Sequence, residues 1–328
     1  MTLHQRAAAA AAAASLLLAA TACGGAEAGP ADDISQVTLR VGDQTGATRA
    51  LLEEAGLLDD VPYEIEWSEY AAAVNLHEAL KADAIDVGGA ADAPTVSAIA
   101  GGSDIQVYAA WSNDGKGTAL VVPEDSDARS LADLEGAEVS PTTRGSIAHF
   151  LLLRALQEEG MDADQVRPAF LAPVDASTAF SSGGIDAWAT WGVYLERARG
   201  ELGARVLVDG EGLLPGYNVL SATGDALADP ATAEALADYA ERVDAGYAWG
   251  REHPDDYAEF YAGFAGQTVA IAEQVTESNT SYQRIPVDAA LGDRLQETYG
   301  TWVGAGVLAD RDLDLGDHIA AGAPPAGE

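Results

Sequence analysis

The chain has 328 residues and carries 53 aspartates and glutamates against 17 lysines and arginines, which gives a formal net charge of −36. A field of this sign repels nucleic acid and anionic lipid, so neither is expected as a partner. The single cysteine excludes internal disulfides, so the body must be stabilised by an apolar core, and about 300 residues most naturally form two lobes.

The first predicted element is an export signal. A positive charge at Arg6 precedes an apolar run, Ala7–Ala20, that is shorter than the ~20 residues needed to span a bilayer. Small residues then lead to Cys23, and the segment resembles a bacterial lipobox, although that motif usually has leucine three residues before the cysteine. We predict a signal peptide over residues 1–22, diacylation of Cys23 as a membrane anchor, and a flexible tether over residues 23–35. The alternative is an ordinary signal peptide followed by an incidental thiol.

Short β-like runs alternate with helical stretches from residue 37 onward, the pattern of an α/β fold. The pattern occurs twice, which predicts two lobes of similar construction. From Asp229 and Pro230 onward the sequence is helical, because aspartate can cap a helix and proline fits its first turn. Aromatic residues at helical spacing in this part are expected to be core rather than ligand site: Tyr239, Tyr247, Tyr299 and Trp302. The expected strands are 37–41, 63–67, 85–89, 105–111, 119–122, 137–139, 166–171, 185–190 and 204–208. The expected helices are 47–55, 71–80, 147–158, 176–180 and 194–199, with one more that begins at Pro94 and ends before Gly101.

The strand-to-helix turns form the candidate site, because ligands of α/β sheets gather at the carboxyl ends of strands. The most informative turn contains Gly145 and Ser146. Glycine permits close approach to the backbone, and Ser146 stands at the N-cap of a helix whose free amides and dipole favour an anion. Ser146 either contacts the anion or only caps its helix. His149, one turn further on, either donates a hydrogen bond to the ligand or forms its hydrogen bonds with neighbouring groups of the protein.

The other turns add four side chains to the predicted site. Gln44 is a neutral amide donor. Asp92 is either a structural cap or the partner of an ammonium group on the ligand, and the cap is the preferred interpretation. Trp191 offers a flat apolar wall, with plain core packing as the alternative. Tyr70 lies in the turn after the second expected strand.

The sequence contains no catalytic motif. Neither a G-x-S-x-G elbow nor an H-E-x-x-H pair occurs, the five histidines lack the spacing of metal ligands, and the one cysteine belongs to the predicted anchor. A phosphate-binding Gly-Lys-Ser/Thr loop is also absent, so the chain is not expected to be a transporter's ATPase. We therefore expect a binding protein without enzymatic activity, cofactor or metal.

From Val41 to Ser221 the chain resembles the aliphatic sulfonate-binding proteins of the nitrate, sulfonate and taurine group of ABC importers. The resemblance rests on segments in the family's order: Asp92-Ala93-Pro94, Leu131-Ala132-Asp133-Leu134-Glu135-Gly136, Arg144-Gly145-Ser146 with His149-Phe150-Leu151-Leu152, Asp175-Ala176, Ala179-Phe180, Ile185-Asp186-Ala187-Trp188 and Ala204-Arg205-Val206-Leu207. It implies an α/β, two-lobed type II periplasmic-binding-protein fold whose C-terminal helical segment packs on the first lobe. The implied domains are 36–115 with 222–315 for lobe 1, 116–221 for lobe 2 and a frayed tail over 316–328, with crossings near Asn113–Thr118 and Tyr217–Ser221.

The family's pocket maps onto Gln44, Asp92, Gly145, Ser146, His149 and Trp191. The chain departs from the family at three turns: Tyr70-Ala71-Ala72-Ala73-Val74 replaces an aromatic-Pro-Ala-Gly-Pro turn, Ile147 replaces an asparagine, and Gly192-Val193 replaces Asp-Pro. The resemblance implies capture of a small organosulfonate-like anion and its delivery to an ABC permease and its ATPase. The carrier would be a monomer that a lipid anchors to the outer face of the cytoplasmic membrane. The departures leave open a nitrate-like anion or a thiamine-type pyrimidine and, less favoured, an enzyme on the same fold.

Overall fold

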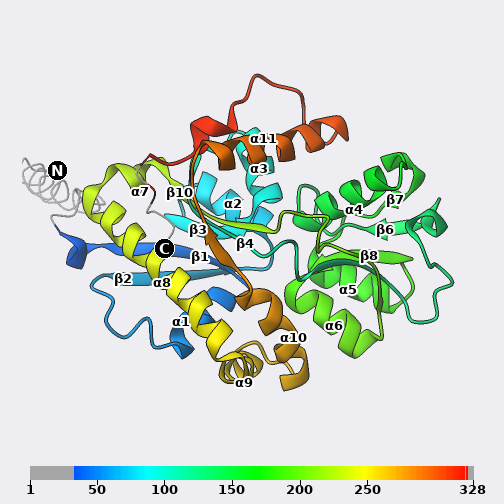
Figure 1. The fold of residues 1–328 in the computed structure, drawn as a ribbon, viewed down its shortest axis with the longest axis horizontal. Coiled ribbons are helices and arrows are strands. Elements are labelled where there is room, and N and C mark those ends of the chain that lie inside the picture. Colours follow the sequence, from blue (N-terminus) through cyan, green and yellow to red (C-terminus); the bar gives the residue numbers. More distant parts are fainter. Residues whose placement is uncertain (1–32, 322, 324–328) are drawn as a thin grey trace, which may run out of the picture.

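The computed structural model describes residues 33–321 and 323, which form two α/β lobes joined by two crossovers (Figure 1). Lobe 1 is built on a six-stranded sheet and lobe 2 on a five-stranded sheet. The predicted two-lobed α/β fold is therefore confirmed. The predicted signal peptide, Cys23 and the tether up to residue 32 lie outside the described residues.

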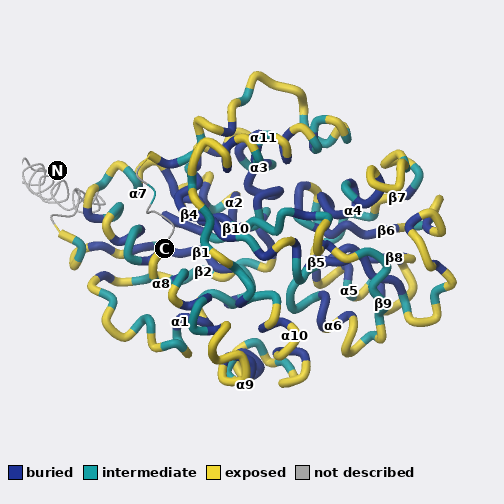
Figure 2. Tube along the Cα trace, in the orientation of Figure 1, coloured by how far each residue is buried: buried dark blue, intermediate teal, exposed yellow. Residues whose placement is uncertain are grey.

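Lobe 1 is a sheet covered by helices on both faces, with the buried residues gathered in and around the strands (Figure 2). Its strands are β1 (Thr38–Gln44), β2 (Glu64–Tyr70), β3 (Val87–Ala91), β4 (Ile105–Ser112), β10 (Tyr217–Thr223) and β11 (Gln283–Ile285). Its helices are α1 (Ala47–Glu54), α2 (Ala73–Lys81), α3 (Asp92–Ala100), α7 (Gly224–Ala228), α8 (Pro230–Glu252), α9 (Pro254–Phe264), α10 (Val269–Thr280) and α11 (Ala289–Gly304). The strand order is β11-β4-β10-β3-β1-β2, and the central strands are apolar on both faces because both are covered.

Lobe 2 repeats this construction on a smaller scale. Its strands are β5 (Thr118–Val122), β6 (Glu138–Ser140), β7 (Arg167–Pro168), β8 (Ala187–Trp191) and β9 (Arg205–Asp209), and its helices are α4 (Ile147–Glu158), α5 (Pro173–Ser181) and α6 (Gly192–Leu202). The strand order is β7-β6-β8-β5-β9. The helix predicted over 147–158 coincides with α4, whereas the strand predicted over 166–171 shrinks to β7, where Pro168 lacks the N–H that would extend the pairing.

Two strand glycines let α2 lie directly on the sheet of lobe 1. A Cβ atom added at Gly42 of β1 would lie 2.5 Å from the Ile85 side chain, and one at Gly88 of β3 would lie 2.6 Å from Leu76 of α2. Any larger residue at either position would push the packed side chains outward. This close packing fixes the N-terminus of α2 at the edge of the sheet where the strands end.

The two crossovers between the lobes are bonded to one another. Residues 113–117 lead from β4 to β5, and residues 210–216 lead from β9 back to β10. Asn113 N donates to Gly216 O at 3.0 Å. A Cβ atom at Gly115, where φ is +87°, would lie 2.3 Å from Gly210 O, so the crossovers can lie backbone to backbone only with glycine there.

Three boundaries differ from the predicted ones. The second crossing precedes Tyr217–Ser221, because these residues pair with β3 and β4 as part of β10 in lobe 1. At the start, a short 3₁₀ helix (Ile34–Gln36) packs on α8, so part of the predicted tether is folded. At the end, another 3₁₀ helix (Leu315–His318) leads to Ala320, whose N–H donates to Val107 O at 3.0 Å, so this part of the predicted frayed tail packs on β4.

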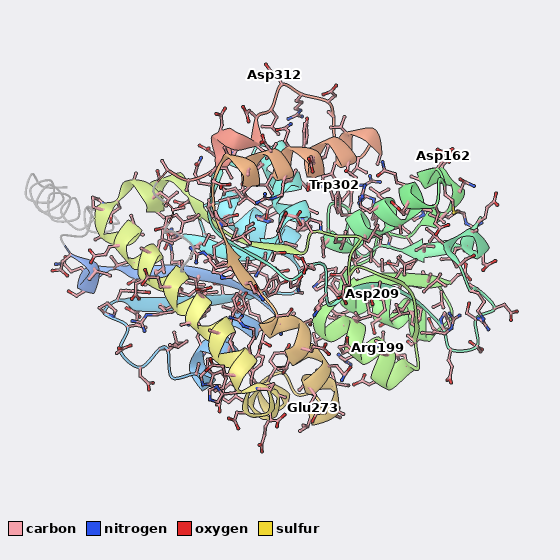
Figure 3. All side chains as sticks on the ribbon, in the orientation of Figure 1. Asp162, Arg199, Asp209, Glu273, Trp302 and Asp312 are labelled. Atoms are coloured by element: carbon pink, nitrogen blue, oxygen red, sulfur yellow. The ribbon has the colours of Figure 1, made fainter. Side chains whose placement is uncertain are left out.

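The helical C-terminal part packs on lobe 1, as predicted, and also reaches lobe 2. Asp229 caps α8 by accepting from Thr232 N, and Pro230 occupies its first turn. Helices α8 and α9 pack on α1, α11 packs on α3, and α10 packs on α6 of lobe 2. Trp302 of α11, which is labelled in Figure 3, lies against His149 and Phe150 of α4, with ring centroids 5.1 and 5.2 Å apart. The two lobes therefore touch on both sides of the space between them.

Candidate ligand-binding site

A cavity of about 170 Å³ lies between the lobes and is lined by residues from both lobes and both crossovers. Five helices begin at its wall, each of them the first helix after a strand of the same lobe. Their first-turn residues in the lining are Ala47 of α1, Ala73 of α2, Pro94 of α3, Ile147 of α4 and Gly192 of α6. Helix N-termini present free N–H groups and the positive end of the helix dipole. At α1 the N–H groups of Thr48 and Arg49 already donate to Asp43, and at α3 the lining residue Pro94 has no N–H. The N-termini of α2, α4 and α6 therefore favour an anion, although the protein as a whole is strongly acidic.

The N-termini of α2 and α6 are open, because neither has a side chain that caps it. They belong to different lobes, and Tyr194 of α6 links them by donating from its hydroxyl to Ala71 O, just before α2, at 3.4 Å. The amides of an uncapped first turn need an acceptor from water or a ligand. An anion held at this place can contact both lobes at once.

Ser146 caps α4 and also lines the cavity. Its hydroxyl oxygen accepts from His149 N at 3.2 Å, and its hydroxyl proton can reach Pro141 O at 3.1 Å or Thr142 Oγ1 at 2.9 Å. The capping role weighed from the sequence is therefore present in the structure. The cap satisfies only His149 N, so the N–H groups of Ile147 and Ala148 have no acceptor within the helix. These N–H groups lie at the end of α4 that faces the cavity.

Gly145 and His149 lie behind this turn and outside the lining. A Cβ atom at Gly145, where φ is +84°, would lie 2.7 Å from Ser97 Oγ of α3, so the glycine allows the two lobes to approach each other. Gly145 N donates to His149 Nδ1 at 3.2 Å. Burial, and then the charge of Arg144, lowers the pKa of His149 to about 4. A neutral imidazole thus holds the turn in place.

Asp92 and Tyr70 also lie outside the lining. Asp92 is fully buried, and its Oδ2 accepts from Thr298 Oγ1 of α11 at 3.3 Å. Burial raises the pKa of Asp92 to about 6. Tyr70 is half-buried at the end of β2, where it pairs in register with Gln44.

Three of the predicted site residues line the cavity: Gln44, Trp191 and Ser146. Gln44 Nε2 donates to Gly89 O at 2.9 Å, which leaves its other N–H and its carbonyl oxygen for a ligand. Trp191 is half-buried and lies edge-on to Tyr194, with ring centroids 6.1 Å apart. Trp191 is therefore part of the cavity wall.

Much of the lining comes from segments that the sequence did not single out. The aromatic part consists of six tyrosines besides Trp191: Tyr194, Tyr217, Tyr247, Tyr257, Tyr261 and Tyr282. Amide side chains come from Asn113, Asn218 and Asn279. Tyr247 was expected in the core, and it is both buried and part of the wall. The available signal was the spacing of Tyr257 and Tyr261, which share one face of α9.

Two charged side chains face the cavity, one of each sign. Within residues 33–321, Lys116 in the first crossover is the one lysine or arginine of the lining, and Asp43 at the end of β1 is the one acid. Asp43 is 5% exposed, and burial raises its pKa to about 6. Lys116 is one of only two lysines in the chain.

Other site types find no support in the described part of the chain. His, Cys, Asp and Glu side chains do not gather there in a group that could hold a metal ion. Within the same residues, no helix has the length and apolar content required to cross a bilayer.

Two α/β lobes, two bonded crossovers and a cavity at the carboxyl ends of strands from both lobes define a two-lobed solute-binding protein. Residues 46–244 match the family model described as ABC transporter, phosphonate, periplasmic substrate-binding protein. The chain therefore belongs to the periplasmic substrate-binding proteins of ABC transporters.

The individual relatives of this chain within that family are sulfonate-binding proteins. A protein of Escherichia coli (strain K12) described as an aliphatic sulfonates-binding protein is 36% identical over 186 residues, which cover 56% of this chain and 58% of that protein, so the match spans little more than half of its length. The alkanesulfonate-binding protein SsuA of Xanthomonas axonopodis pv. citri, solved bound to MOPS, superimposes with a TM-score of 0.79 at 27% identity, over 87% of this chain and 98% of that one. The predicted resemblance to sulfonate-binding proteins is confirmed.

The fold is also shared with an enzyme. The desulfurization enzyme DSZB superimposes with a TM-score of 0.63 at 14% identity, over 87% of this chain and 96% of that one. At this identity the likeness concerns the fold alone.

Proposed function

We propose that this chain is the solute-binding component of an ABC importer that captures a small organosulfonate between its lobes and delivers it to the permease. The observation that carries the proposal is the convergence of three helix N-termini, those of α2, α4 and α6, on one cavity. A sulfonate has three acceptor oxygens and no proton to donate, so it matches a wall of N–H groups. Hydrogen bonds act at contact, whereas salt screens the repulsive field of the acidic protein over ~8 Å.

The aromatic side of the cavity favours an organic anion over a nitrate-like one. Six tyrosines and Trp191 provide apolar surface that an inorganic anion would leave uncovered. A phosphonate, the ligand class in the name of the family model, carries a second charge or a proton at neutral pH. The net charge of −36 opposes the second charge, so the singly charged sulfonate is the better match.

Closure of the lobes on the ligand follows from the placement of the open helix N-termini. Because α2 belongs to lobe 1 and α4 and α6 belong to lobe 2, an anion between them stabilises the closed arrangement over the open one. The bonded crossovers at Asn113 and Gly216 are suited to act as the hinge. The predicted ligand residues Gln44, Ser146 and Trp191 would contact the ligand, while Gly145, His149, Asp92 and Tyr70 would position them.

The site supports binding rather than catalysis. The described residues include no cysteine, and the two buried histidines, His77 and His149, lie outside the lining. Burial lowers the pKa of each histidine to about 4, so both are neutral at physiological pH. Neither is placed to activate a nucleophile on a ligand in the cavity.

The proposed partners and location follow from the family and the N-terminal sequence. The periplasmic substrate-binding family supports an extracytoplasmic location, and Cys23 in its lipobox-like segment supports a lipid anchor on the outer face of the cytoplasmic membrane. The carrier would act as a monomer that docks on the permease, whose ATPase drives import. Treating producing cells with an inhibitor of lipoprotein signal peptidase tests the anchor, and unchanged processing would contradict it.

Calorimetric titration of the full chain with matched ligands tests the substrate class. Ethanesulfonate and ethylphosphonate have the same organic part and differ in the acid group, so their ratio of affinities reports on the anion seat alone. We expect ethanesulfonate to bind and ethylphosphonate to bind at least about tenfold more weakly, since each 1.4 kcal/mol is a factor of ten. Heat from nitrate or thiamine but from no sulfonate would reject the proposal.

A further inference from the structure

Helix α10 lies between the lobes and contacts both of them. It packs on α8 and α9 of lobe 1 and on α6 of lobe 2 (Figure 1). Ile271, Val275 and Ser278 share one face of α10, because helical residues three and four positions apart lie above one another. Val275 and Ser278 line the cavity, whereas Ile271 lies outside it. One face of a single helix therefore meets the ligand site and continues beyond it.

The contact of this face with lobe 2 depends on a glycine within α6. A Cβ atom added at Gly200 would lie 3.3 Å from Cγ1 and 3.6 Å from Cδ1 of Ile271. Gly200 is not among the residues with a positive φ, so its backbone conformation does not call for glycine. Glycine within a helix also lowers the stability of that helix relative to alanine. What the missing side chain provides at this position is the close approach of α6 to α10.

The other end of the same face contacts the first crossover. A Cβ atom at Gly117, where φ is +76°, would lie 2.6 Å from Ser278 Cβ, and Asn113 Nδ2 donates to Ser278 O at 3.5 Å. Ser278 therefore holds α10 at the crossover, and Ile271 lies about 10 Å further along the helix. A rotation of the lobes about the crossovers consequently changes the gap between Ile271 and Gly200 more than the contact at Ser278.

We propose that Gly200 and Ile271 are positioning residues that set the affinity for the ligand from outside the cavity, because their contact decides how far the lobes close. With glycine at position 200, α6 approaches α10 closely and brings its open N-terminus at Gly192 to the cavity. A side chain at this position would act as a wedge between the lobes and hold that N-terminus away from lobe 1. The inference rests on the proposed function only for the choice of a sulfonate as the test ligand.

The Gly200→Val variant tests the wedge. Valine has one strongly preferred rotamer in a helix, so its two γ carbons cannot turn away from α10. Calorimetry on the full chain is expected to give at least about fivefold weaker binding of propanesulfonate, as overpacking of a close contact implies. Gly300→Val is the matched control, because Gly300 is an exposed helical glycine of α11 with no atom within 4 Å of an added Cβ. Its affinity should equal that of the parent.

Urea unfolding separates this role from a merely structural one. A structural role predicts that the unfolding midpoint of Gly200→Val falls together with its affinity. A wedge predicts that the midpoint does not fall, since valine has a higher helix propensity than glycine and the gain is the same in Gly300→Val. A lower midpoint for Gly200→Val than for Gly300→Val, or equal affinities of the two, would overturn the inference and leave the proposed function intact.

A second substitution on α10 should reverse the effect. Ile271→Ala removes the two atoms that an added Cβ would meet, so adding Gly200→Val to it should change the affinity by less than about twofold. A fivefold loss in that background as well would show that the effect does not pass through Ile271. If the parent binds no sulfonate, the proposed function fails, and small-angle X-ray scattering of the ligand-free chains decides the inference. Gly200→Val should then have a larger radius of gyration than Gly300→Val, and equal radii would contradict the wedge.

Discussion

The backbone N–H of Gly145 donates a hydrogen bond to His149 Nδ1, with 3.2 Å between the two nitrogens. Nδ1 therefore carries no proton, so the proton of the neutral ring is on Nε2. The same ring packs edge-on against Phe170, and it lies tilted against Trp302 of lobe 1 with the ring centroids 5.1 Å apart. His149 thus joins the turn before α4 to the opposite lobe and acts as a positioning residue.

Replacing His149 with phenylalanine should destabilise the protein although the ring contacts can persist. The N–H of Gly145 would lose its acceptor in a buried place, which costs about 1–3 kcal/mol of the free energy of unfolding. Urea unfolding monitored by fluorescence measures this change. His253→Phe is the matched control, because His253 is exposed and stacks on Trp249, and its stability should change by less than about 0.5 kcal/mol. An unaltered midpoint for His149→Phe would show that the bond is not structural.

Asp92 should make stability depend on pH in a direction opposite to the usual one for a carboxylate. Burial raises its pKa in the folded protein to about 6, from 3.8 when it is unperturbed. The folded state therefore holds this proton more tightly, so the contribution of Asp92 is fully present below pH 3.8 and is lost as the pH rises through about 6. His77 and His149, with pKa values lowered to about 4, act the other way, and stability is lost as the pH falls from 6.5 towards 4.

The Asp92→Asn variant separates these contributions, because asparagine does not titrate. The difference in free energy of unfolding between the variant and the parent should shift by about 2 kcal/mol, in favour of the parent, between pH 7.5 and pH 4.5. Denaturant titrations at the two pH values measure it. A difference that does not vary with pH would mean that Asp92 titrates normally in the folded protein.

Local sequence signals predicted the parts of the site that are built locally. The strand-to-helix turns at Gln44, Ser146 and Trp191 follow from strand ends and helix starts within a few residues of each other, and all three line the cavity. The Ser146 cap was likewise visible, because it joins residues only three positions apart, Ser146 and His149.

The remaining wall depends on contacts between segments far apart in the sequence. Tyr257 reaches the cavity because α9 packs on α1, and its hydroxyl donates to Ala47 O, 210 residues away. Periodicity marked Tyr247 as buried but could not tell a core position from a cavity wall. The second crossing was misplaced for a related reason, since whether Tyr217–Ser221 is a strand of lobe 1 depends on its partners β3 and β4.

Ser146→Ala should weaken both the fold and ligand binding. Loss of the cap leaves His149 N unsatisfied and costs about 1 kcal/mol of stability. The same change loosens the first turn of α4, whose N–H groups face the anion, so affinity for ethanesulfonate should fall by roughly tenfold. Thr223→Ala removes a comparable cap from α7, where the hydroxyl accepts from Ala226 N at 3.3 Å. It should reduce stability alone, and a similar loss of affinity in that variant would mean that the effect is merely global.

Lys116→Met should weaken sulfonate binding and reduce its dependence on salt. Lys116 is half-buried in the first crossover and is the one cation in the described lining, so its charge acts on a bound sulfonate directly. A hydrogen bond to a charged group is worth about 1.5–3 kcal/mol, so affinity for propanesulfonate should fall at least about tenfold. Calorimetry in low and high sodium chloride should show that the affinity of the variant depends less on salt, because the screened attraction has been removed.

The control variant is Lys81→Met, which removes the other lysine of the chain. Lys81 is exposed and donates to Gly101 O at 2.9 Å, at the C-terminal end of α3. If both variants bind with the affinity of the parent, the crossover contributes no charge to the ligand, and the anion is held by the helix N-termini alone.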